Sequence, residues 1–408
     1  MQPFIPLLFS AAWRSEVYAR FPDHFDILGE TFVLNKQDSG LSRRVFLGGS
    51  IAALGLAGAG VRAADETCFV YISGYNNLVT CFEFNPMTGE MKQLSQSDCG
   101  KNPTYLSIHP SRKFIYAANE IAPGKITSYS IDPKDGKLTL LNEASAGGGG
   151  PCHILVHPDG KWVFTGNYGS GHIGVAPINL DGTVGTPLEP VLGGKNAHQI
   201  SIDPSGKFVF VPFLGSNHVN QYLFDEATGK LTPNDPPFAT ASVDQAGPRH
   251  IAFHPSGRFA YVINEKNCTI DSFEYDRTKG LLSNPKSLPT MPADAYASMK
   301  GKSTAHVVVS PDGKFVYGSN RGHDSIAIYS VDSATGRLTF VAHENGGGEV
   351  KTPRDFALDP SGKFAIVANQ AKDYILVFKR DEAKGTLEKI ASVKVPEKGA
   401  YVGFMAKP

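Results

Sequence analysis

The segment "GPRHIAFHPSGRFAYVINE" (Gly247–Glu265) holds two short runs of strand-forming residues on either side of a Pro-Ser-Gly turn. Proline presets φ and glycine accepts a positive φ, so the segment predicts a β-hairpin. An incomplete copy of the unit begins at Phe69. The second half of the segment recurs at five other places: "HPSRKFIYAANE" (His109–Glu120), "HPDGKWVFTGNY" (His157–Tyr168), "DPSGKFVFVPFL" (Asp203–Leu214), "SPDGKFVYGSNR" (Ser310–Arg321) and "DPSGKFAIVANQ" (Asp359–Gln370).

The spacing of these copies predicts the architecture. They lie about 46 to 56 residues apart, and each contains about four short strands of period two without helical periodicity. Seven such copies predict an all-β, seven-bladed β-propeller, in which radial closure leaves few exposed edges. The copy at Phe69 lacks its first strand, and "GAYVGFM" (Gly399–Met405) is expected to supply it and close the ring. The alternative is an open solenoid, whose ends would need capping repeats that the sequence does not show.

Residues that are alike in the copies are expected to serve the scaffold. The Phe or Trp after the turn is expected to pack between blades, and an Asn recurs at the end of the second strand. Two recurring sets of histidines are interpreted as structural: His109, His157 and His254 beside the turn, and His153, His250 and His306 five residues before its proline.

The residues that differ between copies lie at the other end of the hairpin. Because the open ends of all the hairpins converge on one mouth of the central channel, these residues are expected to form a polar site on a rigid scaffold. Six residues before the proline the copies carry Thr104, Cys152, His198, Arg249, Ala305 and Arg354. Ten residues after it they carry Glu120, Tyr168, Leu214, Glu265, Arg321 and Gln370.

Arg249 and Glu265 are expected to lie nearly opposite each other, because they flank an antiparallel hairpin that turns at Ser256 and Gly257. A structural ion pair is one interpretation. A functional site is the other, since three arginines and a histidine around one opening exceed what a single ion pair needs. Glu120 is the second candidate carboxylate.

At this point the chain resembles a known family. The segments "GPRHIAFHPSGRFAYVINE", "VSPDGKFVYGSNRGHDSIAIY" and "TPRDFALDPSGKFAIVANQAKDYILVF" are similar to the lactonase family of seven-bladed propellers, and the resemblance spans about residues 67 to 406. The family includes bacterial 6-phosphogluconolactonases of the cycloisomerase-2 type and the fungal carboxy-cis,cis-muconate lactonizing enzyme. The resemblance implies a site of one histidine, two arginines and one glutamate, which match His198, Arg249, Arg321 and Glu265.

The resemblance implies hydrolysis of a sugar lactone, of the gluconolactone or 6-phosphogluconolactone type, to the aldonic acid. This reaction needs an activated water, a positive environment for the oxyanion and a proton for the departing alkoxide. Glu265 suits the base, Arg249 and Arg321 suit the oxyanion or a substrate anion, and His198 suits the acid. The substrate is expected to contact four further residues: Glu120, Tyr168, Arg354 and Gln370.

Two other functions remain open. A carboxymuconate-type cyclisation would use the same carboxylate-binding arginines and a proton donor. A non-catalytic exported propeller would use the scaffold as a binding platform, because a fold does not determine a function. Substitution of Glu265 and Arg249 separates the alternatives, since a platform that uses other faces would not respond.

The charge balance argues against a nucleic-acid partner, and the N-terminal segment indicates an exported protein. The 39 basic and 39 acidic residues give a net charge of zero without a basic run, which argues against a nucleic-acid partner. The segment Ser42–Leu47 carries a twin-arginine pair before the small, apolar run Gly48–Val61, as in a Tat signal, and Val61–Ala63 suits cleavage. The run is short for a membrane span, so no stable membrane anchor is expected after cleavage.

The resulting domains are an N-terminal extension with a Tat signal (1–64) and a propeller (65–408). Export through the Tat machinery to the periplasm, or secretion, favours an unphosphorylated lactone, because 6-phosphogluconolactone is made in the cytoplasm. No cofactor is expected, and no Cys or His spacing predicts a metal site. The five cysteines leave a disulfide open between Cys68 and Cys81, which flank a predicted hairpin turn.

Overall fold

A computed structural model describes residues 24–27, 30–33, 66–396 and 398–408. The chain divides into two units, Met1–Val45 and Phe46–Pro408. In the first unit, β1 (His24–Ile27) pairs antiparallel with β2 (Glu30–Val33).

The expected Tat motif and the expected boundary between residues 64 and 65 lie outside the described residues and stay predictions. Within the part of the chain that the structure describes, no helix is long and apolar enough to cross a membrane.

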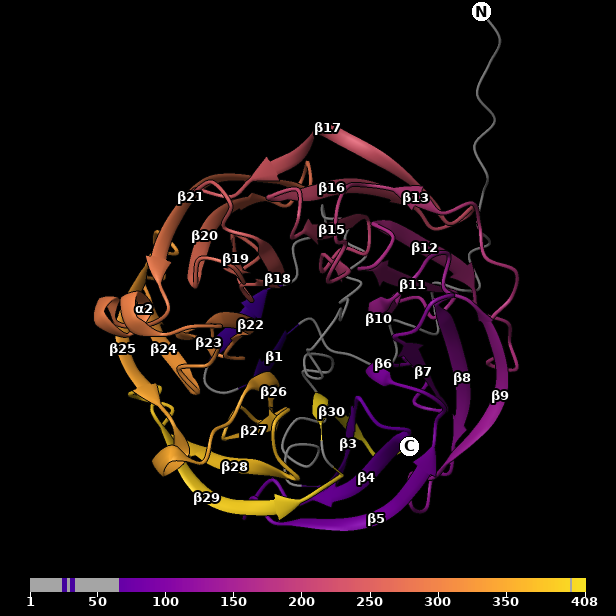
Figure 1. Cartoon of the computed structure of the whole chain (residues 1–408), viewed down its shortest axis with the longest axis horizontal. Coiled ribbons are helices and arrows are strands. Elements are labelled where there is room, and N and C mark those ends of the chain that lie inside the picture. The colour runs from indigo at the N-terminus through magenta and orange to yellow at the C-terminus, as the bar shows by residue number, and fades with distance from the viewer. Residues whose placement is uncertain (1–23, 28–29, 34–65, 397) are drawn as a thin grey trace, which may run out of the picture. The chain divides into compact units, whose positions relative to one another are not determined.

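The second unit confirms the predicted β-propeller. Figure 1 shows seven sheets in a ring, with β6, β18 and β26 toward the middle and β5, β9, β25 and β29 along the rim. From the inner to the outer strand, blade 1 is β30 (Gly399–Ala406), β3 (Cys68–Gly74), β4 (Leu78–Phe84) and β5 (Met91–Asp98). Blade 2 is β6 (Pro103–Ile108), β7 (Phe114–Asn119), β8 (Lys125–Ile131) and β9 (Leu138–Ser145), and blade 3 is β10 (Pro151–Val156), β11 (Trp162–Asn167), β12 (His172–Pro177) and β13 (Val191–Leu192).

The remaining blades follow the same order, and all neighbouring strands are antiparallel. Blade 4 is β14 (Ser201–Ile202), β15 (Phe208–Phe213), β16 (His218–Asp225) and β17 (Lys230–Thr240), and blade 5 is β18 (Pro248–Phe253), β19 (Phe259–Asn264), β20 (Thr269–Asp276) and β21 (Leu281–Pro289). Blade 6 is β22 (Ser303–Val309), β23 (Phe315–Arg321), β24 (Ser325–Val331) and β25 (Leu338–Glu344), and blade 7 is β26 (Pro353–Leu358), β27 (Phe364–Asn369), β28 (Tyr374–Arg380) and β29 (Leu387–Lys394). Two short helices complete the described elements: α2 (Ala293–Ser298) and the 3-10 helix η1 (Gly346–Gly348).

The C-terminal strand closes the ring as predicted. β30 pairs with β3 from Cys68 opposite Ala406 to Gly74 opposite Gly399, and so completes the blade that begins the propeller. Tyr401 and Met405 are buried in the core that blade 1 shares with blade 2. The ends of the propeller therefore hold each other by the same antiparallel hydrogen bonds that join strands elsewhere in the ring.

Repeated contacts join successive blades, and they confirm the scaffold role of the turn histidines. The side chains of His109, His157 and His254 each make a 2.9 Å hydrogen bond from Nε2 to a glycine carbonyl in the next blade's turn. Buried polar side chains need such partners. These histidines therefore link neighbouring blades at the turn end of the hairpins, which is the end away from the candidate site.

The aromatic residue after each turn packs between blades, as predicted. Phe259 lies against Gly336 of blade 6, where a Cβ would meet its ring at 2.4 Å, and Gly336 has a φ of +69°. Tyr261 donates a 3.0 Å hydrogen bond to the carbonyl of the same glycine. A side chain at position 336 would therefore need both a strained backbone and displacement of the ring.

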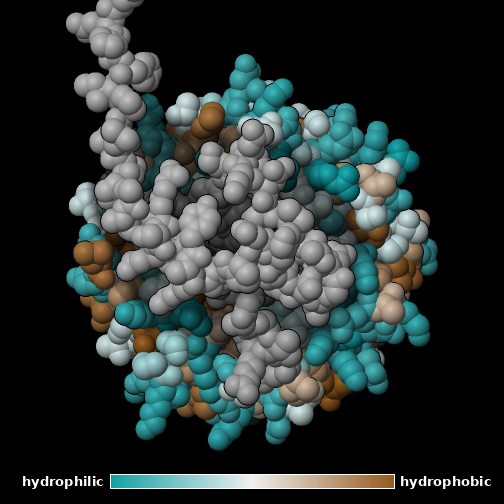
Figure 2. Space-filling model, turned by 180° about the vertical axis from the view of Figure 1, so that it is seen from behind, coloured by the Kyte–Doolittle hydropathy of each residue, from teal (hydrophilic) through white to brown (hydrophobic). Residues whose placement is uncertain are grey.

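The part of the propeller rim that is visible in Figure 2 is mainly hydrophilic. Around the rim in Figure 2, hydrophobic residues occur in separate small groups among hydrophilic ones. On the outer strand β29 the pattern of burial alternates along the sequence, as expected for a strand with one solvated face.

The disulfide that the sequence left open between Cys68 and Cys81 does not form. All five cysteines are free and buried. In the β3–β4 pair, Cys68 lies opposite Phe84 and Cys81 lies opposite Tyr71. Cys68 and Tyr71 are three residues apart and so face opposite sides of the sheet, which places the two thiols in different cores.

Candidate active site

The inner strands position the candidate residues through β-bulges. The register of β18 against β19 shifts between Pro248 and His250, so Arg249 is the extra residue. Bulges re-aim side chains at such points. The same shift occurs in four other blades, at Thr104, Cys152, Arg354 and the pair Ala305–His306.

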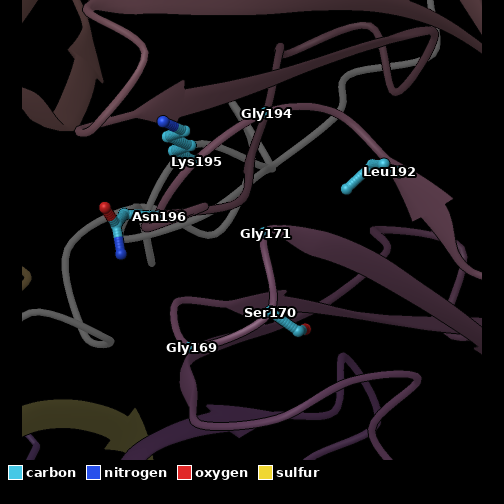
Figure 3. Close-up of a pocket in the computed structure, with 7 residues that line it drawn as sticks. All are labelled: Gly169, Ser170, Gly171, Leu192, Gly194, Lys195 and Asn196. Atoms are coloured by element: carbon cyan, nitrogen blue, oxygen red, sulfur yellow. The ribbon is translucent and has the colours of Figure 1, made fainter.

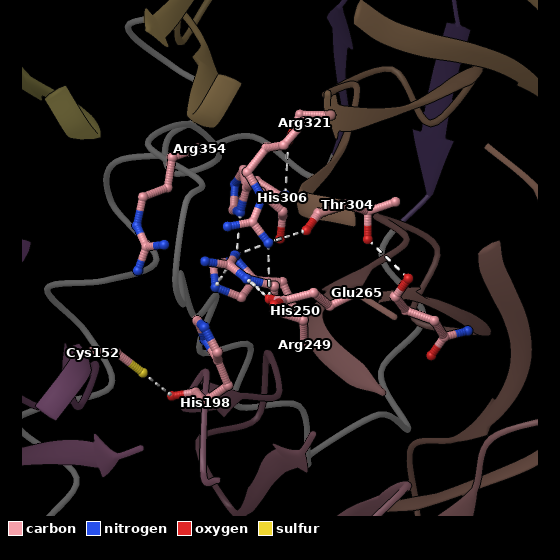
Figure 4. A network of polar contacts seen from close by, with 12 residues as sticks. Cys152, His198, Arg249, His250, Glu265, Thr304, His306, Arg321 and Arg354 are labelled. Carbon is pink, nitrogen blue, oxygen red and sulfur yellow. Dashed lines mark hydrogen bonds and ion pairs between the residues drawn. The ribbon is translucent and has the colours of Figure 1, made fainter. Parts of the chain in front are cut away.

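Glu265 and two arginines form the centre of the candidate site (Figure 4). Arg249 donates from Nε to Glu265 Oε2 over 2.8 Å, and Arg321 Nη2 lies 3.0 Å from the same oxygen. The backbone holds both arginines further, because Arg249 donates to the Ala305 carbonyl over 2.5 Å and Arg321 to the Thr304 carbonyl over 2.8 Å. Among the described residues, Oε1 of Glu265 accepts no hydrogen bond. One carboxylate oxygen is thus held by cations, and the other is available to a water.

The members of this cluster differ in their exposure to solvent. The side chain of Arg249 is 2% exposed, and that of Glu265 is 24% exposed. Burial, and then the neighbouring Arg354 and Arg321, lower the pKa of Arg249 to about 10, so it remains a cation near neutral pH. The arginine is therefore a fixed, largely dehydrated positive charge behind an accessible carboxylate, where its field is screened little.

His198 belongs to the same opening and is neutral there. Its ring centroid lies 4.9 Å from that of His250 and 5.8 Å from that of Tyr168. Burial and the charge of Arg249 hold the pKa of His198 well below its usual range. Its Nδ1 is buried without a hydrogen-bond partner among the described residues. His198 therefore offers a neutral N–H donor, and not the imidazolium that an ordinary histidine acid would supply.

A second carboxylate and arginine lie across the channel mouth. Glu120 Oε2 accepts hydrogen bonds of 2.8 Å from the hydroxyls of Tyr75 and Thr104. Arg354 Nη2 lies 3.9 Å from the same oxygen, and its guanidinium covers the Tyr75 ring at 5.0 Å. Arg354 donates no hydrogen bond to another described residue, and Figure 4 shows its guanidinium directed toward the space beside His198. Its guanidinium thus has an ion-pair contact with Glu120 but no hydrogen-bond acceptor in the part of the chain that the structure describes.

Two expected substrate contacts are less well defined. Tyr168 is half-buried and touches His198 only through their rings. Gln370 is half-buried, and its backbone N–H bonds the Thr352 carbonyl, while its side chain bonds no described residue. The structure thus brings His198, Arg249, Glu265 and Arg321 into one cluster, places Glu120 with Arg354, and leaves Gln370 outside both groups.

The structure also reveals a polar layer beneath this cluster, which we call the polar ring. Several of its side chains accept a backbone N–H of the next blade: His153 from Ile200, and Asp355 from Val402. One residue comes from each blade: Tyr105, His153, Gln199, His250, His306, Asp355 and Tyr401. The histidines were predicted as scaffold, but Asp355 was missed, although counting five residues back from Pro360 would have found it.

A separate hollow lies between a loop of blade 3, residues 169–171, and the segment that leads from blade 3 to blade 4, residues 194–196 (Figure 3). Gly171 approaches the other loop so closely that a Cβ would meet the Gly194 carbonyl at 1.9 Å. The side chain of Asn196 donates to the Tyr168 carbonyl over 3.1 Å and ties the loops together. The hollow is lined by Gly169, Ser170, Gly171, Leu192, Gly194, Lys195 and Asn196.

Among the described residues, no group of His, Cys, Asp or Glu is arranged to hold a metal ion.

Comparisons with known proteins agree with this architecture. Residues 69–403 match the model of a family described as "Lactonase, 7-bladed beta-propeller". The 6-phosphogluconolactonase of Bacillus subtilis is 32% identical over 298 residues, which cover 70% of this chain and 82% of that protein.

Solved structures give the same result over the whole ring. A putative 6-phosphogluconolactonase from Bacteroides fragilis superposes with a TM-score of 0.76 at 29% identity, covering 84% of this chain and 99% of that one. The periplasmic gluconolactonase PpgL of Pseudomonas aeruginosa also has a TM-score of 0.76, at 27% identity, covering 84% of this chain and 100% of that one.

Proposed function

The chain belongs to the lactonase family of seven-bladed β-propellers, and we propose that it hydrolyses sugar lactones of the gluconolactone type to the aldonic acids. The observation that carries the proposal is the carboxylate of Glu265, held through one oxygen by Arg249 and Arg321 at the channel mouth. The names of relatives and structural neighbours, 6-phosphogluconolactonase and periplasmic gluconolactonase, support the reaction class.

Each group in the cluster has a distinct role in the proposed reaction. Glu265 Oε1 takes a proton from a water as the water oxygen bonds to the lactone carbonyl carbon. The charge that develops on the carbonyl oxygen is stabilised by Arg249 and Arg321, which are already in place and need no reorganisation. The ring C–O bond then breaks, and Glu265 returns the proton to the departing ring oxygen. His198, being neutral, orients the substrate through a hydrogen bond.

The reaction needs no covalent nucleophile. Cys152 lies at a bulge of the same opening, but it is buried, and burial raises the pKa of its thiol to about 12. A thiol that stays protonated is a poor nucleophile. The direct attack of water is therefore the mechanism that the described side chains support.

The test is acid release at constant pH from glucono-δ-lactone and from 6-phosphogluconolactone, by the chain from Glu66 to Pro408, corrected for spontaneous hydrolysis. We expect the protein to hydrolyse both lactones faster than buffer alone does. The kcat/KM should be higher for the unphosphorylated lactone. Background rates with both lactones would reject hydrolysis. Binding of either lactone without turnover would favour the platform function instead.

We further propose that Arg354 holds the substrate away from the reacting carbonyl, since its guanidinium has no acceptor among the described residues. A hydrogen bond from a charged donor contributes about 1.5–3 kcal/mol, so Arg354→Met should raise KM for glucono-δ-lactone about 10- to 100-fold with a smaller change in kcat. Arg112→Met is the matched control, because Arg112 is exposed and donates to the Lys407 carbonyl elsewhere in the ring. An unchanged KM in Arg354→Met would exclude this role.

We also propose export of the chain to the periplasm by the Tat machinery. The support is the Ser42–Leu47 motif, which lies outside the described residues, and the periplasmic gluconolactonase among the structural neighbours. Replacing Arg43 and Arg44 together by lysine should move the full-length protein from the periplasmic to the cytoplasmic fraction. The same distribution of both proteins on cell fractionation would contradict the proposal.

A further inference from the structure

A continuous line of contacts runs from the candidate site into the polar ring. Arg249 Nη1 lies 3.0 Å from His250 Nε2, and His250 Nδ1 lies 2.6 Å from His306 Nδ1. His306 Nδ1 in turn lies 3.4 Å from Asp355 Oδ1. All four side chains are at least nine-tenths buried. Arg249 on the inner strand of blade 5 is therefore connected through His250 and His306 to a carboxyl group on the inner strand of blade 7, two blades away.

The chemistry of arginine decides the protonation of both histidines. A guanidinium has donors only, so His250 Nε2 must be the acceptor of the Arg249 contact. A neutral imidazole has one acceptor nitrogen, so His250 carries its proton on Nδ1 and donates it to His306 Nδ1. His306 then carries its own proton on Nε2. Burial supports neutral rings, since it lowers the pKa of His250 well below the usual range and that of His306 to about 3.

This arrangement leaves Asp355 beside a nitrogen that cannot donate to it. Asp355 Oδ2 accepts the backbone N–H of Val402 over 3.0 Å, but Oδ1 is buried without a hydrogen-bond partner among the described residues. An ionised Oδ1 would face the lone pair of His306 Nδ1. A protonated Oδ1 removes this repulsion, because its O–H can share the lone pair of His306 Nδ1 with the Nδ1–H of His250, as in a three-centre hydrogen bond.

The surroundings of Asp355 favour the neutral acid. The groups that face it are Arg249 from β18, Arg354 on its own strand, His306 from β22, and the phenols Tyr105 from β6 and Tyr401 from β30. Burial outweighs the two arginines and raises the pKa of Asp355 to about 7. The carboxyl is thus neutral below about pH 7 and ionised above it.

We propose that Asp355 is a positioning residue: its neutral carboxyl preserves the tautomers of His306 and His250 that let His250 accept a hydrogen bond from Arg249. Ionisation of Asp355 reverses the line: the proton of His306 moves from Nε2 to Nδ1, where the carboxylate and His250 Nδ1 share it as acceptors. The proton of His250 moves to Nε2, where it points at Arg249 Nη1. Two donors then face each other, and Arg249 loses an acceptor that holds it in place.

The kinetic part of this proposal rests on the proposed lactonase function, and it predicts a pH profile. The kcat/KM of the wild type should fall by on the order of tenfold as pH rises through about 7, because a small misplacement of a positioned group is costly. Asp355→Asn cannot ionise, and its amide N–H₂ can donate to His306, so its profile should lack this fall. Asp355→Leu removes the donor and should lower kcat/KM at every pH.

A control variant shows whether loss of any buried carboxyl changes the pH profile. A spectroscopic measurement detects the tautomers without depending on the reaction. Asp359→Asn removes another buried carboxyl of the same hairpin, at its turn end, where Asp359 accepts the N–H of Phe364; it should keep the wild-type pH profile. In ¹⁵N-histidine-labelled protein at pH 6, NMR should show His250 protonated on Nδ1 and His306 on Nε2, with both protons shifting position above pH 7 in the wild type only.

The outcomes separate the two proposals. An alkaline fall that persists in Asp355→Asn, or a His250 protonated on Nε2 at pH 6, would overturn the positioning role. Absence of lactone hydrolysis together with the expected NMR tautomers would reject the proposed function and retain the coupling between Asp355 and Arg249.

Discussion

Glu265→Gln should lower kcat/KM for glucono-δ-lactone by about a hundred- to ten-thousandfold, the range typical for loss of a general base. Glutamine keeps the size of the side chain and an acceptor for Arg249 and Arg321, which lie 2.8 and 3.0 Å from the native Oε2. It cannot take a proton from water. The measurement is acid release at constant pH, with thermal unfolding followed on the same samples.

Glutamine is preferable to alanine because Glu265 also neutralises two arginines. Arg249 is almost fully buried, and the side chain of Arg321 is 14% exposed. Removing one partner of a buried ion pair costs about 3–5 kcal/mol, since it leaves an uncompensated charge. Glu265→Ala should therefore lose both activity and stability, and only the glutamine variant separates the two effects.

The control for Glu265 is Glu143→Gln, the same substitution in an exposed ion pair with Lys125. It should leave activity and unfolding close to the wild type, because exposed ion pairs contribute little. Wild-type turnover in Glu265→Gln would remove this residue from the mechanism. In that case the pair with Arg249 would be a structural ion pair.

Deletion of residues 399–408 should abolish the folded propeller. The deletion removes β30, exposes the edge of β3 along its whole length, and uncovers core around the buried Tyr401, Val402 and Met405. Truncating a large buried side chain costs roughly 2–5 kcal/mol, and three such losses approach the roughly 5–15 kcal/mol that stabilises a whole domain. We expect loss of the cooperative thermal transition, measured by circular dichroism.

Complementation tests whether the loss comes from strand pairing. A synthetic peptide of residues 399–408 should restore the transition when added in excess, because it can re-form the β3 pairing as an added strand. A peptide of the same composition in scrambled order should not. A truncated chain that melts like the full chain would show that β30 is dispensable for closure.

The internal repeats made most of the fold predictable. Six copies of one hairpin, all with Pro and five with Gly in the turn, predict the strands, their order and the number of blades before any contact is known. The missing strand at Phe69 predicts its partner at Gly399–Met405, and the structure confirms this pairing. The same repeats separated His109, His157 and His254 from the candidate site, and each of them bonds the next blade.

The candidate site was predictable to the extent that one hairpin contains it. Arg249 and Glu265 flank a single turn, so antiparallel pairing alone brings them together. The contact between Glu265 and Arg321 joins two blades, and the repeat could indicate only that both residues face one opening. Gln370 satisfied the same count along the sequence, yet its side chain bonds no described residue.

The amino-acid sequence by itself determined the number of blades, the closure of the ring and the end of the hairpins at which the candidate residues gather, because these follow from local turn chemistry repeated along the chain. Only the tertiary structure decided which side chains touch. The bulge that turns both Arg249 and His250 toward the channel changes the strand register by one residue, and the line from His250 through His306 to Asp355 crosses three blades. Contacts of this kind depend on bulges and on packing between distant segments, which the alternation of side chains along a single strand does not specify.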